Sequence, residues 1–304
     1  MNWLILAILA PVLWAITSFI DKFLVSKYFK SSVGTLIVYS CLIGLPAAFL
    51  IAIFKPSVLI LNWKIASLIV FNSFLFILYL FPYFRALRKA DTSVVVTLFQ
   101  TIPVFSFILA FFILGETLTN FQIVGSALII LGAIGISLSF HKGKFHLTKE
   151  VLFLQLLASF LISLNYILFK LFALDTDFWT TSFWQYLGFF IFGLILLICF
   201  KSYRKDFVES FRKNKESIIL LNVLNEVINI FAIVIVTFVS LSAPVAVVSS
   251  IMNGFQPLCA FIIGIILSIL FPKIIKENLS KKVLVQKIIF ILLVFLGVYL
   301  LSLV

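Results

Sequence analysis

Long apolar runs alternate with short polar segments along the whole chain, and this pattern predicts ten membrane-spanning helices. A helix needs about 20 mainly apolar residues to cross the hydrocarbon core of a bilayer. The predicted spans cover residues 3–20, 33–54, 65–84, 93–114, 121–140, 151–172, 183–200, 217–239, 244–271 and 287–304. The connections between the fourth and fifth spans and between the eighth and ninth are so short that each pair must form an antiparallel hairpin. The ninth span is long enough to require tilt or a kink.

Composition agrees with an all-α integral membrane protein and excludes the main soluble classes. Of the 304 residues, 63% are hydrophobic and 11% are charged, whereas soluble domains contain about 45 to 50% apolar and about 25% charged residues. Cys41, Cys199 and Cys259 lie inside apolar runs and form no C-x-x-C motif, so we interpret them as small apolar side chains. The first apolar run has no basic segment before it and no small-residue cleavage site. It therefore predicts a retained first span and not a signal peptide.

Membrane topology explains the net charge of +12 better than a nucleic-acid partner does. Twenty of the 23 Lys and Arg residues fall on the side of the membrane that receives the connections after spans one, three, five, seven and nine. They are Lys22, Lys27, Lys30, Arg85, Arg88, Lys89, Lys142, Lys144, Lys149, Lys201, Arg204, Lys205, Arg212, Lys213, Lys215, Lys273, Lys276, Lys281, Lys282 and Lys287. The other side has Lys55, Lys64 and Lys170. Basic connections face the cytoplasm, so we predict a multi-pass protein of the plasma (inner) membrane with both termini extracytoplasmic.

The chain contains a weak internal repeat. A shift of 154 residues places Phe84, Leu87 and Pro103 on Phe238, Leu241 and Pro257. Each half then has five spans, and because five is odd the halves must be inverted relative to each other. We therefore predict two inverted five-helix repeats, residues 1–140 and 151–304, joined by a basic linker at 141–150.

Residues 84–138 carry a combination of motifs: an Ala-Leu entry, a span with a central proline, Leu-Gly-Glu, a threonine and a final span with glycines. These positions are Ala86, Leu87, Pro103, Leu114, Gly115, Glu116, Thr119, Gly125 and Gly132. The segment resembles the EamA family of the drug/metabolite transporter superfamily. The second half departs from the motif, since Ile269 and Leu270 stand at the offset positions of Gly115 and Glu116. The resemblance implies a carrier that moves small metabolites, amino acids or amphipathic compounds by alternating access, commonly driven by an ion gradient.

Glu226 is the acidic residue that lies well inside a predicted span, where a carboxylate costs about 2.5 to 3.5 kcal/mol. Asn222, Asn225 and Asn229 share its helical spacing, so the four form one polar stripe that can face a cavity but not lipid. A hydrogen-bonded helix-helix seam with an inert, protonated Glu226 is the alternative interpretation. Such a seam rarely needs an ionisable group, which favours a solute site with Glu226 as the proton-coupling group.

Further candidate solute contacts are amide side chains near the middle of other spans. They are Asn72, Gln100, Asn253 and Gln256. Asn72 stands at the offset position of Glu226, and inverted symmetry would place the two across from each other. The others precede Pro103 or Pro257, where a proline releases a backbone carbonyl four residues upstream. Helix-helix hydrogen bonding remains an equal alternative for this group.

The remaining polar and aromatic candidates are interpreted as structural. Four aromatic residues could wall a pocket but fit core packing or an interfacial belt better: Trp14, Tyr79, Tyr166 and Trp184. Asp21 and Lys22 end the first span and fit an interfacial pair, with a gate as the less favoured alternative. Glu116 is expected to cap the fifth span. His141 and His146 lie in the basic linker, and without further ligands they predict no metal site.

Together these observations predict a secondary active transporter of a small polar metabolite or amino-acid-like solute, with protons as the candidate coupling ion. The expected partners are the lipid bilayer and the solute, the expected assembly is a monomer or homodimer, and no cofactor, metal, catalytic residue or nucleic acid is expected. An intramembrane enzyme is disfavoured because paired intramembrane aspartates, an H-E-x-x-H helix and a Ser/His pair are absent from the sequence. A channel-like or purely structural membrane protein on the same scaffold is the other alternative.

Overall fold

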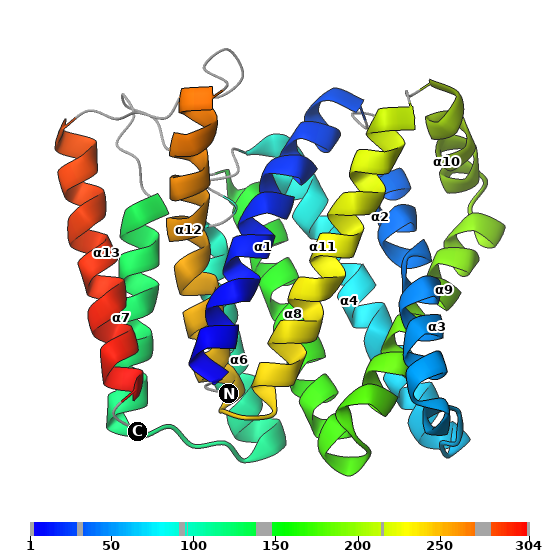
Figure 1. Ribbon diagram of the computed structural model, residues 1–304, viewed down its shortest axis with the longest axis horizontal. Helices are drawn as coiled ribbons and strands as arrows, with labels where there is room; N and C mark the ends of the chain where they lie inside the picture. Colours follow the sequence, from blue (N-terminus) through cyan, green and yellow to red (C-terminus); the bar gives the residue numbers. More distant parts are fainter. Residues whose placement is uncertain are drawn as a thin grey trace.

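A computed structural model of the chain describes residues 3–28, 33–90, 95, 97–137, 148–213, 216–270 and 281–302 (Figure 1). Within these residues every regular element is helical. The α-helices are α1 (Trp3–Phe23), α2 (Val33–Leu42), α3 (Gly44–Phe54), α4 (Trp63–Lys89), α6 (Ile102–Leu114), α7 (Asn120–Ser137), α8 (Lys149–Asp175), α9 (Phe178–Cys199), α10 (Lys201–Lys213), α11 (Glu216–Ser240), α12 (Val245–Leu270) and α13 (Lys281–Ser302). Short turns of other helix types are η1 (Leu24–Tyr28), η2 (Pro56–Leu59) and η3 (Phe99–Thr101).

Among the described residues, eight helical segments are long and apolar enough to cross a membrane, and two shorter apolar helices accompany them. The two shorter ones, Phe99–Leu114 and Asn120–Ile136, correspond to the predicted fourth and fifth spans. Gly115, with a φ of 66°, ends α6 in the left-handed conformation that glycine adopts most readily. The prediction of an all-α membrane protein is confirmed.

The predicted span at residues 33–54 is confirmed as one candidate span, Gly34–Phe54, and its helix is interrupted at Ile43. The chain turns at Ile43 between α2 and α3. Pro46 has no backbone N–H for the carbonyl of Leu42, four residues earlier, so the helix breaks where that bond would form. Gly44 permits the close contact made there, since a Cβ atom at this position would lie 2.3 Å from the Tyr186 carbonyl oxygen.

The sequence interpretation missed α10, which it treated as a basic loop. Its apolar side chains recur at helical spacing, and they pack on α2 and its neighbours. The Phe207 ring lies 5.1 Å from that of Tyr39, and the Tyr39 and Ser210 hydroxyl groups are hydrogen-bonded at 3.2 Å. At 13 residues with a basic face, α10 is too short and too charged to resemble a span.

The predicted linker also needs correction, because α8 begins at Lys149, two residues before the expected start of the second half. Thr148 caps this helix by accepting a hydrogen bond from the Val151 N–H at 3.2 Å. The rest of the linker, with His141 and His146, lies outside the described residues.

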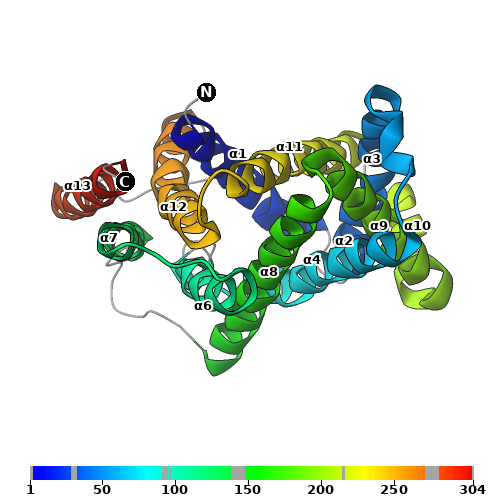
Figure 2. The same cartoon turned by 90° about the horizontal axis from the view of Figure 1, so that it is seen from below.

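Seen from below, α12, α1 and α11 form one row that faces a second row of α6, α8 and α4 (Figure 2). Each row mixes helices from both sequence halves, because α1 packs on α11 and α12 while α8 packs on α4 and α6. The α7 and α13 helices form a pair at the periphery. The two rows therefore enclose the centre of the molecule between residues that are far apart in the sequence.

Candidate functional site

A central cavity of about 620 Å³, including the part open to the outside, lies between the two rows of helices. Its polar lining comes from α1, α2, α4, α8, α11 and α12. The polar lining residues are Trp14, Thr17, Ser18, Asp21, Ser40, Tyr79, Tyr83, Tyr166, Asn225, Glu226, Asn229, Asn253 and Gln256. The lining residues of α1 and α4 lie in the second half of each helix, and those of α11 lie near its middle. The cavity therefore extends toward the end of the bundle where α1 finishes, the upper end in Figure 1.

Three members of the predicted α11 stripe line this cavity: Asn225, Glu226 and Asn229. Glu226 is 5% exposed, and its Oε1 accepts a 2.6 Å hydrogen bond from the Ser40 hydroxyl of α2. Asn229 Oδ1 accepts from the Trp14 indole N–H at 3.2 Å. Asn222 is fully buried away from the cavity lining, and both atoms of its amide lack a hydrogen-bond partner among the described residues.

Asp21 is a cavity residue, and the interpretation of Asp21 with Lys22 as an interfacial pair was wrong for the aspartate. Its Oδ1 accepts from Asn225 Nδ2 at 2.8 Å, and its Oδ2 accepts from the Tyr83 hydroxyl at 3.1 Å. The Lys22 ammonium instead donates to the carbonyl oxygens of Leu87 and Ala90, both at 2.9 Å.

A signal for Asp21 was present in the sequence. Trp14, Thr17, Ser18 and Asp21 occupy positions i, i+3, i+4 and i+7 of one helix, so they share one face of α1. All four line the cavity. This polar face of the first span is the counterpart of the α11 stripe that was recognised.

The aromatic residues interpreted as packing divide into two groups. Trp14, Tyr79 and Tyr166 line the cavity, so the alternative of an aromatic pocket describes their position. Trp184 lies elsewhere, and its indole N–H donates to the Val58 carbonyl oxygen at 3.0 Å. Spacing alone did not separate them, because the apolar helices of this protein carry aromatic residues on every face.

Two of the four mid-span amides line the cavity. Gln256 Nε2 donates to the Ser18 hydroxyl at 3.3 Å, and Asn253 Nδ2 donates to the Ser249 carbonyl at 2.8 Å. Gln100 is not a lining residue. It donates at 2.8 Å to the carbonyl oxygen of Asn253, which is the carbonyl that Pro257 frees four residues downstream. Gln100 therefore repairs the proline break in α12.

Asn72 lies outside the cavity lining, in a seam between α4, α8 and α9. Asn72 and Asn165 each donate from the side-chain amide to the other's backbone carbonyl, at 3.3 and 3.0 Å, and Asn72 also donates to Gln185 Oε1 at 3.4 Å. The structure thus places it in a helix-helix contact and not across the cavity from Glu226.

The opposite end of the bundle carries a cluster that we call the clamp: Glu116, Lys170 and the first turn of α12. The Lys170 ammonium donates to Glu116 Oε1 at 2.7 Å and to the Ala243 carbonyl at 2.9 Å, while Glu116 Oε2 accepts from the Val245 N–H at 2.9 Å. The Glu116 carboxylate therefore caps α12. The prediction that it caps the fifth span was wrong. Thr119 and Gln122 cap α7 instead, through reciprocal hydrogen bonds between side chain and backbone.

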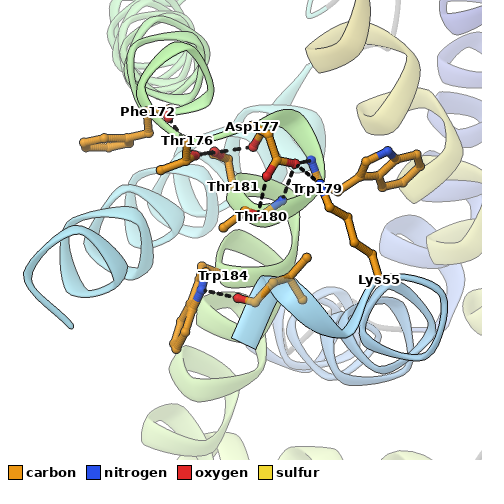
Figure 3. Close-up of polar contacts among 9 residues, drawn as sticks. Lys55, Phe172, Thr176, Asp177, Trp179, Thr180, Thr181 and Trp184 are labelled. Carbon is orange, nitrogen blue, oxygen red and sulfur yellow. Dashed lines mark hydrogen bonds and ion pairs between the residues drawn. The ribbon is translucent and has the colours of Figure 1, made fainter. Parts of the chain in front are cut away.

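A second polar group lies at the clamp end, at the start of α9 (Figure 3). Asp177 caps this helix by accepting from the Trp179 and Thr180 N–H groups at 2.9 and 3.1 Å, and it pairs with Lys55 at 2.7 Å. Partial burial raises the pKa of Asp177, but the Lys55 ammonium and the hydrogen bonds from Thr180 and Trp179 outweigh it and lower the pKa to about 2. The described residues contain no group of three or more His, Cys, Asp or Glu that could hold a metal ion.

Comparisons with known proteins agree with this architecture. Residues 1–138 match the EamA-like transporter family. A solved structure titled "Crystal structure of protein" is similar in fold, with a TM-score of 0.70 and 14% sequence identity over 99% of this chain and 96% of that chain. A search of curated proteins found no match. The family resemblance is confirmed for the N-terminal half; it implies transmembrane transport by a multi-pass membrane protein, and members of this family are generally not enzymes.

Proposed function

The N-terminal half of this chain belongs to the EamA-like transporter family, and from this premise we propose that the protein is a secondary active transporter of a small polar or amino-acid-like solute. The observation that carries the proposal is the central cavity, in which the buried carboxyl group of Glu226 and four amide side chains of α11 and α12 surround one space. Ionisable groups within a membrane mark solute and proton pathways. One chain lines the whole cavity, so a monomer and a homodimer would both serve.

The proposed scaffold is ten membrane helices in two inverted five-helix repeats. Several helix contacts support it, because they recur when α1 is exchanged with α8, α2 with α9, α4 with α11 and α6 with α12. Contacts of α1 with α11 and α12 match those of α8 with α4 and α6, and the contact of α4 with α9 matches that of α11 with α2. Transporters with inverted repeats bind solute between the halves and expose the site to each side in turn.

We assign the end toward which the cavity extends to the cytoplasm of the inner membrane. Lys22, Lys89 and Lys201 are among the basic residues at this end, whereas Lys55, Lys64 and Lys170 lie at the clamp end. In this orientation the structure is inward-facing, and the clamp closes the extracytoplasmic side.

Glu226 is the proposed proton-coupling group. It hydrogen-bonds Ser40, and the other titratable groups that line the same cavity are Asp21 of α1, Tyr79 and Tyr83 of α4, and Tyr166 of α8. Closure around a neutral carboxyl group costs less than closure around a carboxylate, because low dielectric disfavours the charged form. Water entering the open cavity makes proton release feasible, so proton binding and solute movement share one site.

Uptake of a defined mixture of amino acids and small metabolites into proteoliposomes, with and without a pH gradient, tests this function. Glu226→Gln keeps the volume and hydrogen-bonding capacity but removes the titration, so we expect it to abolish gradient-driven accumulation while folding stays intact. Glu150→Gln is the matched control, since Glu150 pairs with Lys89 on the exterior. Normal pH-dependent accumulation by Glu226→Gln would reject Glu226 as the coupling group, and no solute uptake by the unaltered protein would reject transport.

A further inference from the structure

We propose that the transported solute is an organic amine with an apolar, ring-sized body and no carboxylate, and that Asp21 with Asn225 binds its ammonium group. This inference rests on the proposed transport function and narrows its solute class. It begins from the charges in the cavity, where Asp21 and Glu226 are acidic and none of the lining residues in the described part of the chain is Lys, Arg or His. Because Glu226 is assigned to proton coupling, the carboxyl group of Asp21 remains to bind a cationic solute.

The hydrogen bonds around Asp21 supply an observation independent of charge. Asn225 donates its amide N–H to Asp21. The Asn225 Oδ1 atom is therefore turned away from the Asp21 carboxylate. That oxygen is buried, belongs to a side chain only 2% exposed that lines the cavity, and has no hydrogen-bond partner among the described residues. The reverse amide orientation would set an oxygen against the carboxylate, so the arrangement of these two groups is determined.

The cavity therefore offers acceptors beside Asp21. A carboxylate has about four acceptor sites and receives two hydrogen bonds here, from Asn225 and Tyr83. An ammonium group has three donors and no acceptor, so it matches the spare Asp21 lone pairs together with Asn225 Oδ1.

Three of the donors that line the cavity are already used within the protein, and no lining residue in the described part of the chain is cationic. The Trp14 indole donates to Asn229, the Ser40 hydroxyl to Glu226 and the Gln256 amide to Ser18. A solute carboxylate would have to displace these bonds and approach two acidic side chains without a cation to balance it. This asymmetry separates a simple amine from a zwitterionic amino acid.

The wall next to Asp21 is aromatic. Tyr83 stacks on Phe99 with ring centroids 5.5 Å apart, and Tyr79 lies 6.2 Å from Tyr83. All three rings line the cavity with Trp14. Aromatic faces attract organic cations and bury apolar groups, so the wall fits both parts of the proposed solute.

Equilibrium binding to the detergent-purified full-length protein at pH 7 tests this inference with three probes of one shape: 2-phenylethylamine, phenylalanine and 3-phenylpropionate. We expect the amine to bind at least tenfold more tightly than either of the others. Asp21→Asn retains the side-chain shape and should weaken amine binding at least tenfold, whereas Glu150→Gln should leave it unchanged. A thermal unfolding scan of each variant shows whether it is folded.

Equal binding of amine and amino acid, tighter binding of phenylpropionate, or no binding of the amine would overturn the inference. So would unchanged amine binding by a folded Asp21→Asn variant. If that variant fails to fold, the order of the three probes on the unaltered protein still decides. Because binding in detergent needs no gradient, amine binding without gradient-driven uptake would reject the transport function and leave the amine site standing.

Discussion

The two ends of the helix bundle use charged side chains in opposite ways. Toward the basic end, Asp21 and Glu226 lie in an open cavity and receive hydrogen bonds from neutral partners. At the clamp end, Glu116 is bound to Lys170 and to the first N–H of α12, with side chains only 14% and 11% exposed. Acidic groups that lack a cationic partner leave capacity for a ligand, whereas fully paired ones hold helices together. The acidic group at the clamp end is held by a cation, whereas the two acidic groups of the cavity are not.

The largest expected effect concerns which compartment each end faces. A reporter fused after Val304 should be active in the extracytoplasmic compartment and silent in the cytoplasm, because 20 of the 23 basic residues fall at the opposite end. Paired reporters that require opposite compartments, such as a phosphatase and a fluorescent protein, make the result all-or-none. A cytoplasmic signal would reverse the assignment and make the clamp the inner closure.

Removal of the clamp cation should open the closed end. Lys170→Met leaves the nearly buried Glu116 carboxylate without its cation, and loss of one partner of a buried pair costs about 3 to 5 kcal/mol at most. A shift of about 1.4 kcal/mol toward the open state already changes its population tenfold. We therefore expect at least tenfold faster labelling of a cysteine introduced at buried Ser240 by a membrane-impermeant thiol reagent, in a background without Cys41, Cys199 and Cys259.

Lys55→Met is the matched control for this experiment, because it removes a lysine at the same end whose pair with Asp177 is 38% and 40% exposed. Surface pairs of this kind contribute about 0 to 1 kcal/mol, so the labelling rate should stay within about twofold of the starting background. Equal labelling of the Lys170→Met and Lys55→Met variants would mean that the clamp does not close this end.

The smallest effect is expected at Asp177. Its pKa in the folded protein, about 2, is below its ordinary value of 3.8, so its ionised form contributes stability that is present above about pH 4 and is lost as pH falls toward 2. Because the pair is well exposed, we expect no more than about 1 kcal/mol. Between pH 5 and pH 2.5, the unfolding temperature should fall less steeply for Asp177→Asn than for the unaltered protein. Identical slopes of unfolding temperature against pH would contradict the low pKa of Asp177.

The sequence was sufficient for the membrane-spanning helices, although not for α10, and for one side of the site. Apolar runs located the spans, and the spacing of Asn225, Glu226 and Asn229 identified a polar face that does line a cavity. It was insufficient where the role of a residue depends on its neighbour across the bundle. Asp21 resembles an interfacial residue until α11 is placed beside it.

Two amide side chains show the same limit of sequence analysis, because they were predicted to contact solute but bind other helices. Asn72 has the same chemistry as Asn229, but α8 and α9 pack against it and accept hydrogen bonds from its amide nitrogen. Gln100 was selected because of a nearby proline, yet the carbonyl it binds was freed by Pro257, 157 positions further along the chain. Helical periodicity identifies a polar face, and only tertiary packing determines whether that face meets solute or another helix.

The interleaving of the two halves has a consequence for biosynthesis. Asp21 enters the membrane with α1, but its partner Asn225 follows 204 residues later. At about 5 to 20 residues per second this interval lasts on the order of ten to forty seconds. During that time the carboxyl group has no native partner from α11, and a neutral, protonated form or a position near the lipid headgroups costs least. The insertion machinery must therefore hold an unfinished binding site in the bilayer until the last helices complete it.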